Sequence, residues 1–176
     1  IEMLLHRVRS QSEHADVDPN GILGLEVGEV QDASILQNHV IVTGNINDLT
    51  LFFTELRKPV VMEMVPHPIL VVNPKRPSGW EALVNKFSDV HWLRGDLLMA
   101  RDYNRSNIKQ AYSLIMLANT ASSNVETTSH DVDASALDRN LDAENLFTAM
   151  KLERHVPSNV FFSVELICAP NIAVLN

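Results

Sequence analysis

The sequence predicts an α/β domain with a mostly parallel β-sheet and helices on both faces of that sheet. Short runs of β-branched and other apolar residues recur along the chain, which is typical of strands buried on both sides. Segments with apolar residues at helical spacing separate these runs, and such alternation is typical of right-handed crossovers between parallel strands. A chain of 176 residues, 45% of them hydrophobic, can bury a sizeable core. We therefore expect a doubly wound, Rossmann-like domain.

Five segments carry the strand pattern. The clearest is 39–43, His-Val-Ile-Val-Thr, a run of mostly β-branched residues that ends at Gly44. The other four are short apolar runs that lie next to turn-forming residues. In chain order, the predicted strands are 39–43, 68–72, 90–93, 113–117 and 159–164.

The clearest helix is predicted over 80–87. Ser78 stands just before this segment and can cap its first turn. The apolar residues recur at i, i+3, i+4 and i+7, which places them on one face of a helix. These residues are Trp80, Leu83, Val84 and Phe87.

Three other segments are predicted to be helical. A helix over 49–57 follows the capping residues Asn47 and Asp48 and ends before a proline. Residues 97–109 have the pattern of one or two helical turns. Residues 141–155 carry apolar side chains at helical spacing, with polar residues between them and a proline beyond the end.

Two regions are less regular. Residues 118–138 are rich in Ser, Thr, Asn and Asp, and form either a long excursion or an insert followed by the start of the next helix. Residues 1–15 begin with helical spacing, whereas 22–37 are an irregular linker in which a short strand is an option. We therefore divide the chain into an N-terminal arm or linker, 1–37, and an α/β domain, 38–176, that we expect to be truncated at its C-terminal end.

The composition excludes several classes of protein. Acidic residues number 22 against 14 Lys and Arg, and a formal charge of −8 argues against a nucleic-acid partner, which requires a basic surface. The single cysteine, Cys168, excludes a disulfide framework and a cysteine-rich zinc site. No apolar run approaches the ~20 residues that a membrane span requires. The chain begins at Ile without a signal segment, so we expect a fragment of a longer protein.

The dinucleotide fingerprint of Rossmann folds is absent. That fingerprint places three glycines after the first strand, where the backbone must approach a pyrophosphate. Here the corresponding segment, 44–49, keeps only Gly44, and Asp48 would bring a negative charge close to the phosphates. The second strand ends in Asn73 instead of the acid that binds the ribose hydroxyls. The sequence therefore predicts that NAD does not bind.

One segment resembles the first half of an EF-hand calcium loop. Asp16, Asp18 and Asn20 occupy positions one, three and five, and a glycine follows at position six. Position twelve should be a bidentate acid but is Val27. A plain turn explains the same residues, and we prefer that interpretation. Asp16, Asp18 and Asn20 remain the candidate metal ligands, and Ca²⁺ the candidate ion.

The other polar residues do not form a catalytic set. The histidines and the late acids have no ligand spacing, and no nucleophile motif is present. Arg94-Gly95-Asp96 follows the third strand, but a turn whose Asp96 caps the next helix explains it. We therefore expect that the protein is not an enzyme. The histidines are His6, His14, His39, His67, His91, His130 and His155, and the late acids are Asp131, Asp133, Asp138, Asp142 and Glu144.

The ordered series of elements resembles an RCK domain (regulator of potassium conductance). The similarity is closest to the second RCK domain of BK-type calcium-activated potassium channels. The first helix has a trailing proline, the second carries a Trp-Glu-x-Leu run, and a glycine follows the third strand. In order, the matching segments are 38–42, 49–59, 67–72, 80–83, 90–93, 95–108, 113–118, 141–149, 164–166 and 171–175.

This resemblance implies a regulatory role. RCK domains lie on the cytoplasmic side of the plasma membrane, attached through a linker to the pore domain of a tetrameric channel. They assemble with one another into a gating ring, which expands on ligand binding and opens the pore. Residues 1–37 would then be the linker from a preceding RCK domain. The acidic calcium bowl of the family would follow Asn176, so no bowl residue can be assigned here.

Two other functions remain open on the sequence. The first is a nucleotide-binding regulatory module of a potassium uptake system, which is also Rossmann-like. The second is a dehydrogenase-like enzyme, which would need an intact cofactor site. Binding of NADH, ATP or ADP would favour these alternatives, and the missing glycines predict that none of them binds.

Overall fold

The computed structural model describes residues 27–44, 49–58, 67–118 and 134–166, with the backbone alone for 134–141. Several predictions lie outside this part of the chain. They include the Asn47-Asp48 cap and the segments 1–15, 119–133 and 167–176.

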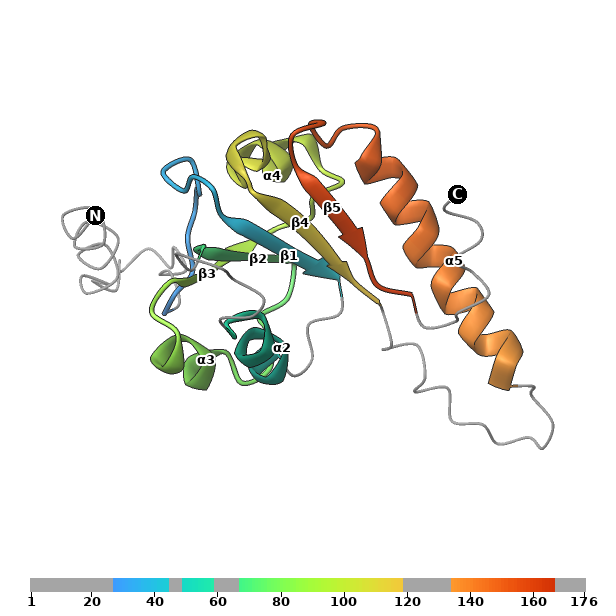
Figure 1. Ribbon diagram of the computed structural model, residues 1–176, viewed down its shortest axis with the longest axis horizontal. Helices are drawn as coiled ribbons and strands as arrows, with labels where there is room; N and C mark the ends of the chain where they lie inside the picture. Colours follow the sequence, from blue (N-terminus) through green and yellow to red (C-terminus); the bar gives the residue numbers. More distant parts are fainter. Residues whose placement is uncertain (1–26, 45–48, 59–66, 119–133, 167–176) are drawn as a thin grey trace, which may run out of the picture.

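The described residues contain a five-stranded sheet in the order β3-β2-β1-β4-β5, in which every neighbouring pair is parallel (Figure 1). This order leads outward in both directions from β1, which confirms the doubly wound, Rossmann-like fold. Each predicted strand forms within two residues of its expected bounds. The strands are β1 (Val40–Gly44), β2 (Ile69–Asn73), β3 (Val90–Arg94), β4 (Ser113–Leu117) and β5 (Phe161–Val164).

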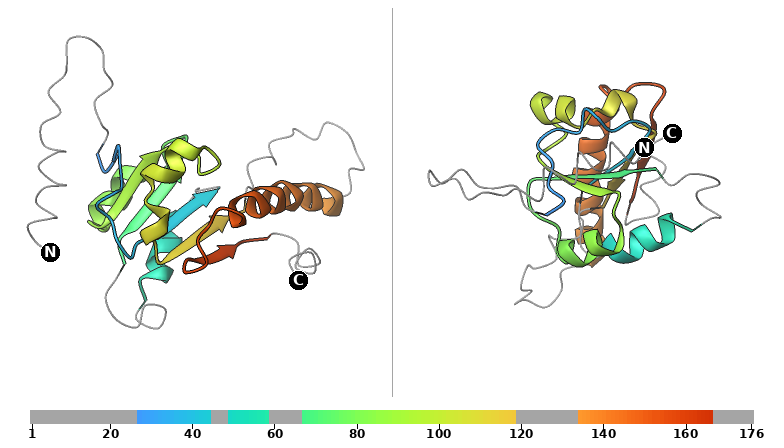
Figure 2. Two further views of the ribbon diagram at one scale, coloured as in Figure 1. Left: turned by 90° about the horizontal axis from the view of Figure 1, so that it is seen from above. Right: turned by 90° about the vertical axis from the view of Figure 1, so that its left-hand side faces the viewer.

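Helices cover both faces of the sheet (Figures 1 and 2). One face packs against α2 (Leu49–Leu56) and α3 (Trp80–Lys86), whose buried side chains join those of the strands in one apolar cluster. The opposite face packs against α4 (Ala100–Arg105), the 3₁₀ turn η1 (Ile108–Gln110) and α5 (Ala134–Glu153). The alternation of side chains along each strand therefore divides the core into two layers.

Two helix starts differ from the sequence prediction. Ser78 makes no capping hydrogen bond, because α3 begins after Gly79, which has the left-handed φ of +68° at the N-cap. The last helix begins at Ala134, seven residues before the predicted start at 141. Residues 134–140 include one large apolar residue, Leu137, so periodicity cannot reveal this part of the helix.

The segment before β1 packs on the outer edge of β3. The Val30 amide donates to the Trp92 carbonyl, and the Trp92 amide donates to the Gly28 carbonyl, both at 2.8 Å. Glu29 forms an isolated parallel bridge with Trp92, so the described part of this linker contains one bridge and not the short strand that the sequence left as an option. Further along, the Asn107 side chain donates to the Leu36 carbonyl at 2.9 Å. The segment is thus fixed to the sheet, and a domain boundary at residue 38 stays a prediction.

Candidate ligand site at the carboxyl edge of the sheet

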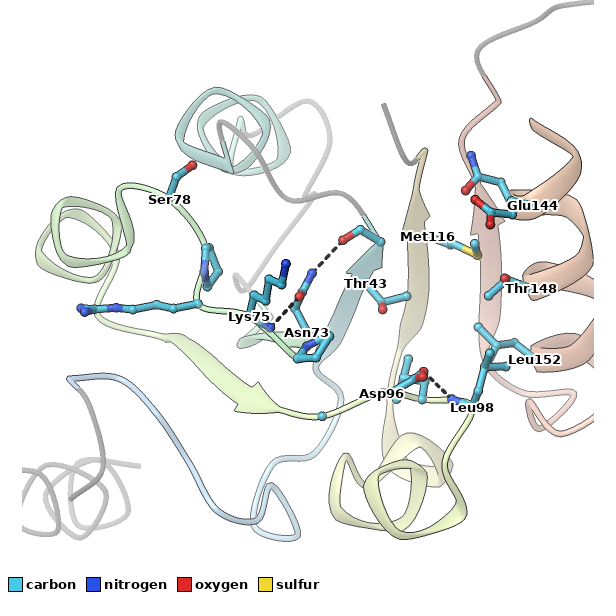
Figure 3. A pocket seen from close by; sticks show the side chains of 17 residues that line it. Thr43, Asn73, Lys75, Ser78, Asp96, Leu98, Met116, Glu144, Thr148 and Leu152 are labelled. Atoms are coloured by element: carbon cyan, nitrogen blue, oxygen red, sulfur yellow. Dashed lines mark hydrogen bonds between the residues drawn. The ribbon is translucent and has the colours of Figure 1, made fainter. Parts of the chain in front are cut away.

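A cavity of about 710 Å³ opens at the carboxyl ends of the parallel strands. The ends of β1 and β2, the residues after β3, and one side of α5 line it. In an open α/β sheet this edge is the usual place for a ligand, because the strand order reverses beside β1. Figure 3 shows Asn73 and Lys75 on one side, and Glu144, Thr148 and Leu152 on the α5 side.

Gly44 closes the end of β1 tightly against β4. Its φ is +100°, and a Cβ atom placed on it would lie 2.1 Å from the Leu117 carbonyl oxygen. Only glycine fits this backbone. Gly44 is the one fingerprint glycine that the sequence keeps. The close packing of β1 against β4 is sufficient to explain it.

Asn73 at the end of β2 braces the cavity wall. Its Nδ2 donates to the Gly44 carbonyl oxygen at 2.9 Å, and its Oδ1 accepts the Lys75 amide at 3.0 Å (Figure 3). Its own carbonyl accepts the Trp92 indole Nε1–H at 3.0 Å. Asn73 occupies the position where a dinucleotide site needs a carboxylate. Its side-chain amide instead links the ends of β1 and β2, and both its nitrogen and its oxygen are hydrogen-bonded.

Asp102 is a buried carboxylate below the third strand end. Its Oδ1 accepts Arg101 Nε and Arg105 Nη1, both at 2.9 Å, and its Oδ2 accepts the Asp96 amide at 3.1 Å. The hydrogen bond from Arg101 is the main cause that holds the pKa of Asp102 below its usual value, against the opposing effect of burial. This carboxylate is therefore ionised at neutral pH and serves to hold α4 to the strand end.

Gly95 makes room for that carboxylate. A Cβ atom on Gly95 would lie 2.7 Å from the Asp102 Oδ2 atom, which is shorter than any ordinary contact. The glycine after the third strand, which contributed to the family resemblance, is explained by this close approach.

The Arg94-Gly95-Asp96 motif has the structural role that the sequence favoured, with one correction. Asp96 Oδ1 accepts the Leu98 amide at 2.9 Å and so stabilises a turn. It does not cap α4, which starts after Met99 and has no side-chain cap, because that turn intervenes. Arg94 lies over the Trp92 ring at 5.0 Å and pairs with Glu29 at 3.3 Å.

Two histidines are buried on the α4 face. His39 Nε2 lies 3.0 Å from the Ser106 carbonyl oxygen, so this nitrogen carries the proton. Burial lowers the pKa of His39, and it lowers the pKa of His91, where Asp89 opposes the shift. Sequence spacing could not identify this pair, because 52 residues separate them and neither has a ligand motif.

The candidate metal ligands Asp16, Asp18 and Asn20 lie outside the described residues, so the Ca²⁺ prediction stays a prediction. In the described part of the chain, no three or more His, Cys, Asp and Glu side chains gather as a metal site would require. None of the helices within those residues has the length and apolar character to cross a membrane.

Apolar side chains are exposed on the face of α5 that points away from the sheet. Phe147 is 67% exposed and Met150 is 46% exposed, and their i, i+3 spacing places them side by side. Leu98 and Met99, just before α4, are also exposed. The core face of α5 is formed instead by Leu146, Ala149 and Leu152, which are buried.

The strand order and the position of the cavity define a Rossmann-like domain that lacks the dinucleotide fingerprint. In a comparison with protein families, residues 35–174 match the calcium-activated potassium channel slowpoke-like RCK domain. This match covers most of the chain, and the chain therefore belongs to that family. The resemblance to RCK domains of BK-type channels is confirmed. A search of curated proteins found no match.

Proposed function

We propose that this chain is a regulatory domain of a cytoplasmic gating ring, which couples ion binding and domain assembly to the opening of a potassium channel. Membership of the slowpoke-like RCK family over residues 35–174 is the observation that carries the proposal. RCK domains regulate channels and are not enzymes, and we extend this to the present chain. The domain would lie at the cytoplasmic side of the plasma membrane, joined through a linker to the pore domain.

Exposed apolar residues on the helices support assembly with other RCK domains in a homotetrameric ring. Phe147 and Met150 on α5, with Leu98 and Met99 before α4, offer apolar surface that an isolated domain leaves in water. Burial of such surface is favourable by about 25 cal/mol per Å². A neighbouring RCK domain is the partner that the family supplies.

Ligand activation requires a difference in affinity between two states of the ring. A bound ion opens the pore only if it binds the open-state ring more tightly than the closed one. Ca²⁺ is the ion that we propose from the family, and Asp16, Asp18 and Asn20 are the candidates within this chain.

The assembly proposal is tested by light scattering of the purified 176-residue chain across a range of concentrations. We expect self-association, and we expect the double substitution Phe147→Lys and Met150→Lys to shift the population toward monomer. Leu51→Lys is the matched control, because Leu51 is 63% exposed on α2, on the other face of the sheet. A monomeric wild-type chain at high concentration would contradict the gating-ring role.

The calcium proposal is tested separately by titration calorimetry with Ca²⁺ and with Mg²⁺ as the comparison ion. Asp16→Asn with Asp18→Asn should abolish any heat that comes from this segment. Unchanged Ca²⁺ binding in that variant would remove these residues as ligands. Absence of binding in the wild-type chain would leave Ca²⁺ activation to sites elsewhere in the channel.

The alternative is a nucleotide-binding regulatory module of a potassium uptake system. The cavity has the position that a nucleotide would occupy, which favours it. Against it, the Asn73 amide is engaged by Gly44 and Lys75, and this side chain offers no carboxylate to a ribose. Fluorescence titration with NADH, ATP and ADP distinguishes the two proposals. We expect no binding, and micromolar binding of any of the three would favour the uptake module.

A further inference from the structure

The loop between β2 and α3 forms one rim of the cavity and is open to solvent. Residues 74–79 are exposed except for Pro77, which is buried and anchors the loop to the domain. A Cβ atom built on Gly79 would meet no atom within 4 Å, so the end of this loop is surrounded by open space. A macromolecule can therefore reach the loop without moving the core.

Ser78 lies in this loop with its hydroxyl unengaged. It makes no capping bond to α3, and within the described part of the chain no hydrogen bond involves its side chain. Figure 3 shows the Ser78 side chain projecting from the loop, on the opposite side of the cavity from α5. A primary alcohol that is exposed and free of internal bonds is available to an incoming electrophile.

Two cations precede this serine. Lys75 is three residues and Arg76 two residues before it, and both are exposed. Pro77 restricts Arg76 to an extended backbone, which presents the two side chains as a strand-like peptide would. Kinases that select basic substrates read such a pattern with carboxylates in the substrate groove.

The ion pair between Arg76 and Glu81 does not prevent such recognition. Arg76 pairs with Glu81 at 3.1 Å, and the two side chains are 34% and 73% exposed. An ion pair that is this exposed to solvent contributes about 0–1 kcal/mol to the stability of the fold. Exchange of the Glu81 carboxylate for a carboxylate of an enzyme therefore costs little.

We propose that Ser78 is the phosphate acceptor for a serine/threonine protein kinase of the class that selects basic residues before the target. The Ser78 Oγ attacks the γ-phosphorus of ATP, and the bond from that phosphorus to the bridging oxygen of ADP breaks. The hydroxyl proton passes to the catalytic aspartate of the kinase, and ADP is the leaving group. The product carries a phosphate monoester at residue 78.

The phosphate would change the charge of the cavity rim. It adds about −1.5 to −2 charges at pH 7, which offsets the positive charges of Lys75 and Arg76. Arg76 can then pair with the phosphate in place of Glu81. One modification thus brings the net charge of residues 74–79, to which Lys75 and Arg76 each contribute a positive charge, close to zero.

The experiment treats the folded chain with the catalytic subunit of cAMP-dependent protein kinase and Mg-ATP, and locates the phosphate by peptide mass spectrometry. We expect modification at Ser78, complete loss of that site in Ser78→Ala, and at least a tenfold lower rate in Arg76→Ala. Ser88 is the matched control, because it is exposed and follows Lys86 by two residues but has Asn85 in place of a cation three residues before it. Circular dichroism of each variant establishes that the fold is retained.

A synthetic peptide of residues 72–82 separates the sequence from its presentation in the fold. Phosphorylation of the peptide but not of the folded chain would overturn the proposal, because the loop would then be inaccessible. An unmodified Ser78 beside a fully phosphorylated reference peptide would overturn it as well. Equal rates at Ser78 and Ser88, or an unchanged rate in Arg76→Ala, would show that the two cations do not direct the reaction.

Discussion

The two faces of the sheet are built from different kinds of side chain. The face that packs against α2 and α3 is apolar and rich in aromatic rings: Trp80 and Trp92 meet edge to face at 6.3 Å, and Phe53 meets Phe87 in the same way. Ser113 is the buried polar residue that strand alternation places on this face, within the described part of the chain. We call this layer the sealed layer, because its apolar side chains are buried from solvent.

The face that packs against α4, η1 and α5 combines an aliphatic cluster with buried polar groups and borders the cavity. Its polar groups can change protonation or exchange partners, whereas a sealed apolar layer has no such freedom. The comparison teaches that one sheet can bury an aromatic, apolar layer on one face and ionisable side chains among aliphatic ones on the other. The buried polar residues on this face are His39, His91, Asp102, Ser106, Asp142 and Asn145.

The largest expected effect comes from breaking the sealed layer. Trp92→Ala should lower the free energy of unfolding by about 3–5 kcal/mol, because it removes a fully buried ring and leaves a cavity. It also removes the indole bond to the Asn73 carbonyl. Urea unfolding followed by circular dichroism measures the change. Phe147→Ala, at an exposed position, should cost under about 0.5 kcal/mol. Equal losses would contradict burial of the Trp92 ring as the source of this stability.

A smaller loss is expected on the polar face from Gly95→Ala. The new methyl group would overlap the Asp102 carboxylate and should cost about 1–3 kcal/mol in the free energy of unfolding. The same substitution in an Asp102→Ala background should cost less than half as much, because the overlap is then absent. Chemical denaturation of the four proteins completes the cycle, and additive losses would show that the contact is not the cause.

The two histidines should make stability depend on pH. Their folded-state pKa values lie below the ordinary value of 6.5, so the unfolded chain binds protons first as the pH falls. Stability should be fully present above about pH 6.5 and should decrease below it, by up to about 1.4 kcal/mol per pH unit for each histidine. Urea unfolding between pH 8 and pH 5 measures this slope.

Substitutions on the two faces distinguish this cause from general acid sensitivity. His91→Gln removes one titrating group and should flatten the slope, although Asp89 partly offsets the shift at that site. Trp92→Phe on the sealed face should lower stability by the same amount at every pH. An unaltered slope in His91→Gln would rule out His91 as a contributor.

The smallest effects are expected from ion pairs at the end of α2. Arg57 pairs with Asp89 with side chains 13% and 30% exposed, whereas Lys58 and Glu55 form a pair in which both side chains are 55% exposed. Arg57→Ala should cost about 1 kcal/mol and Lys58→Ala under about 0.5 kcal/mol. Thermal unfolding at low and high salt measures both, and a larger loss in Lys58→Ala would reverse the expected order.

Much of the fold follows from the sequence alone. The apolar runs that became β1 to β5, and the i, i+3, i+4 stripe of α3, are local patterns that a reader of the chain can count. Parallel strands separated by helices admit few arrangements, so the fold class followed from their order. The family resemblance rested on the same ordered series and is confirmed by the match over residues 35–174.

The roles of individual residues were decided only in three dimensions. The sequence assigned Asn73 to a missing ribose contact and Gly95 to a turn, but their partners, Gly44 and Asp102, became neighbours only when the strand ends came together. The docking of residues 27–30 on β3 likewise joins segments about sixty positions apart. Periodicity shows only which face of a helix or strand is apolar. The hydrogen bonds of Asn73, the close contact of Gly95 and the burial of the histidines depend on residues that lie far away in the sequence.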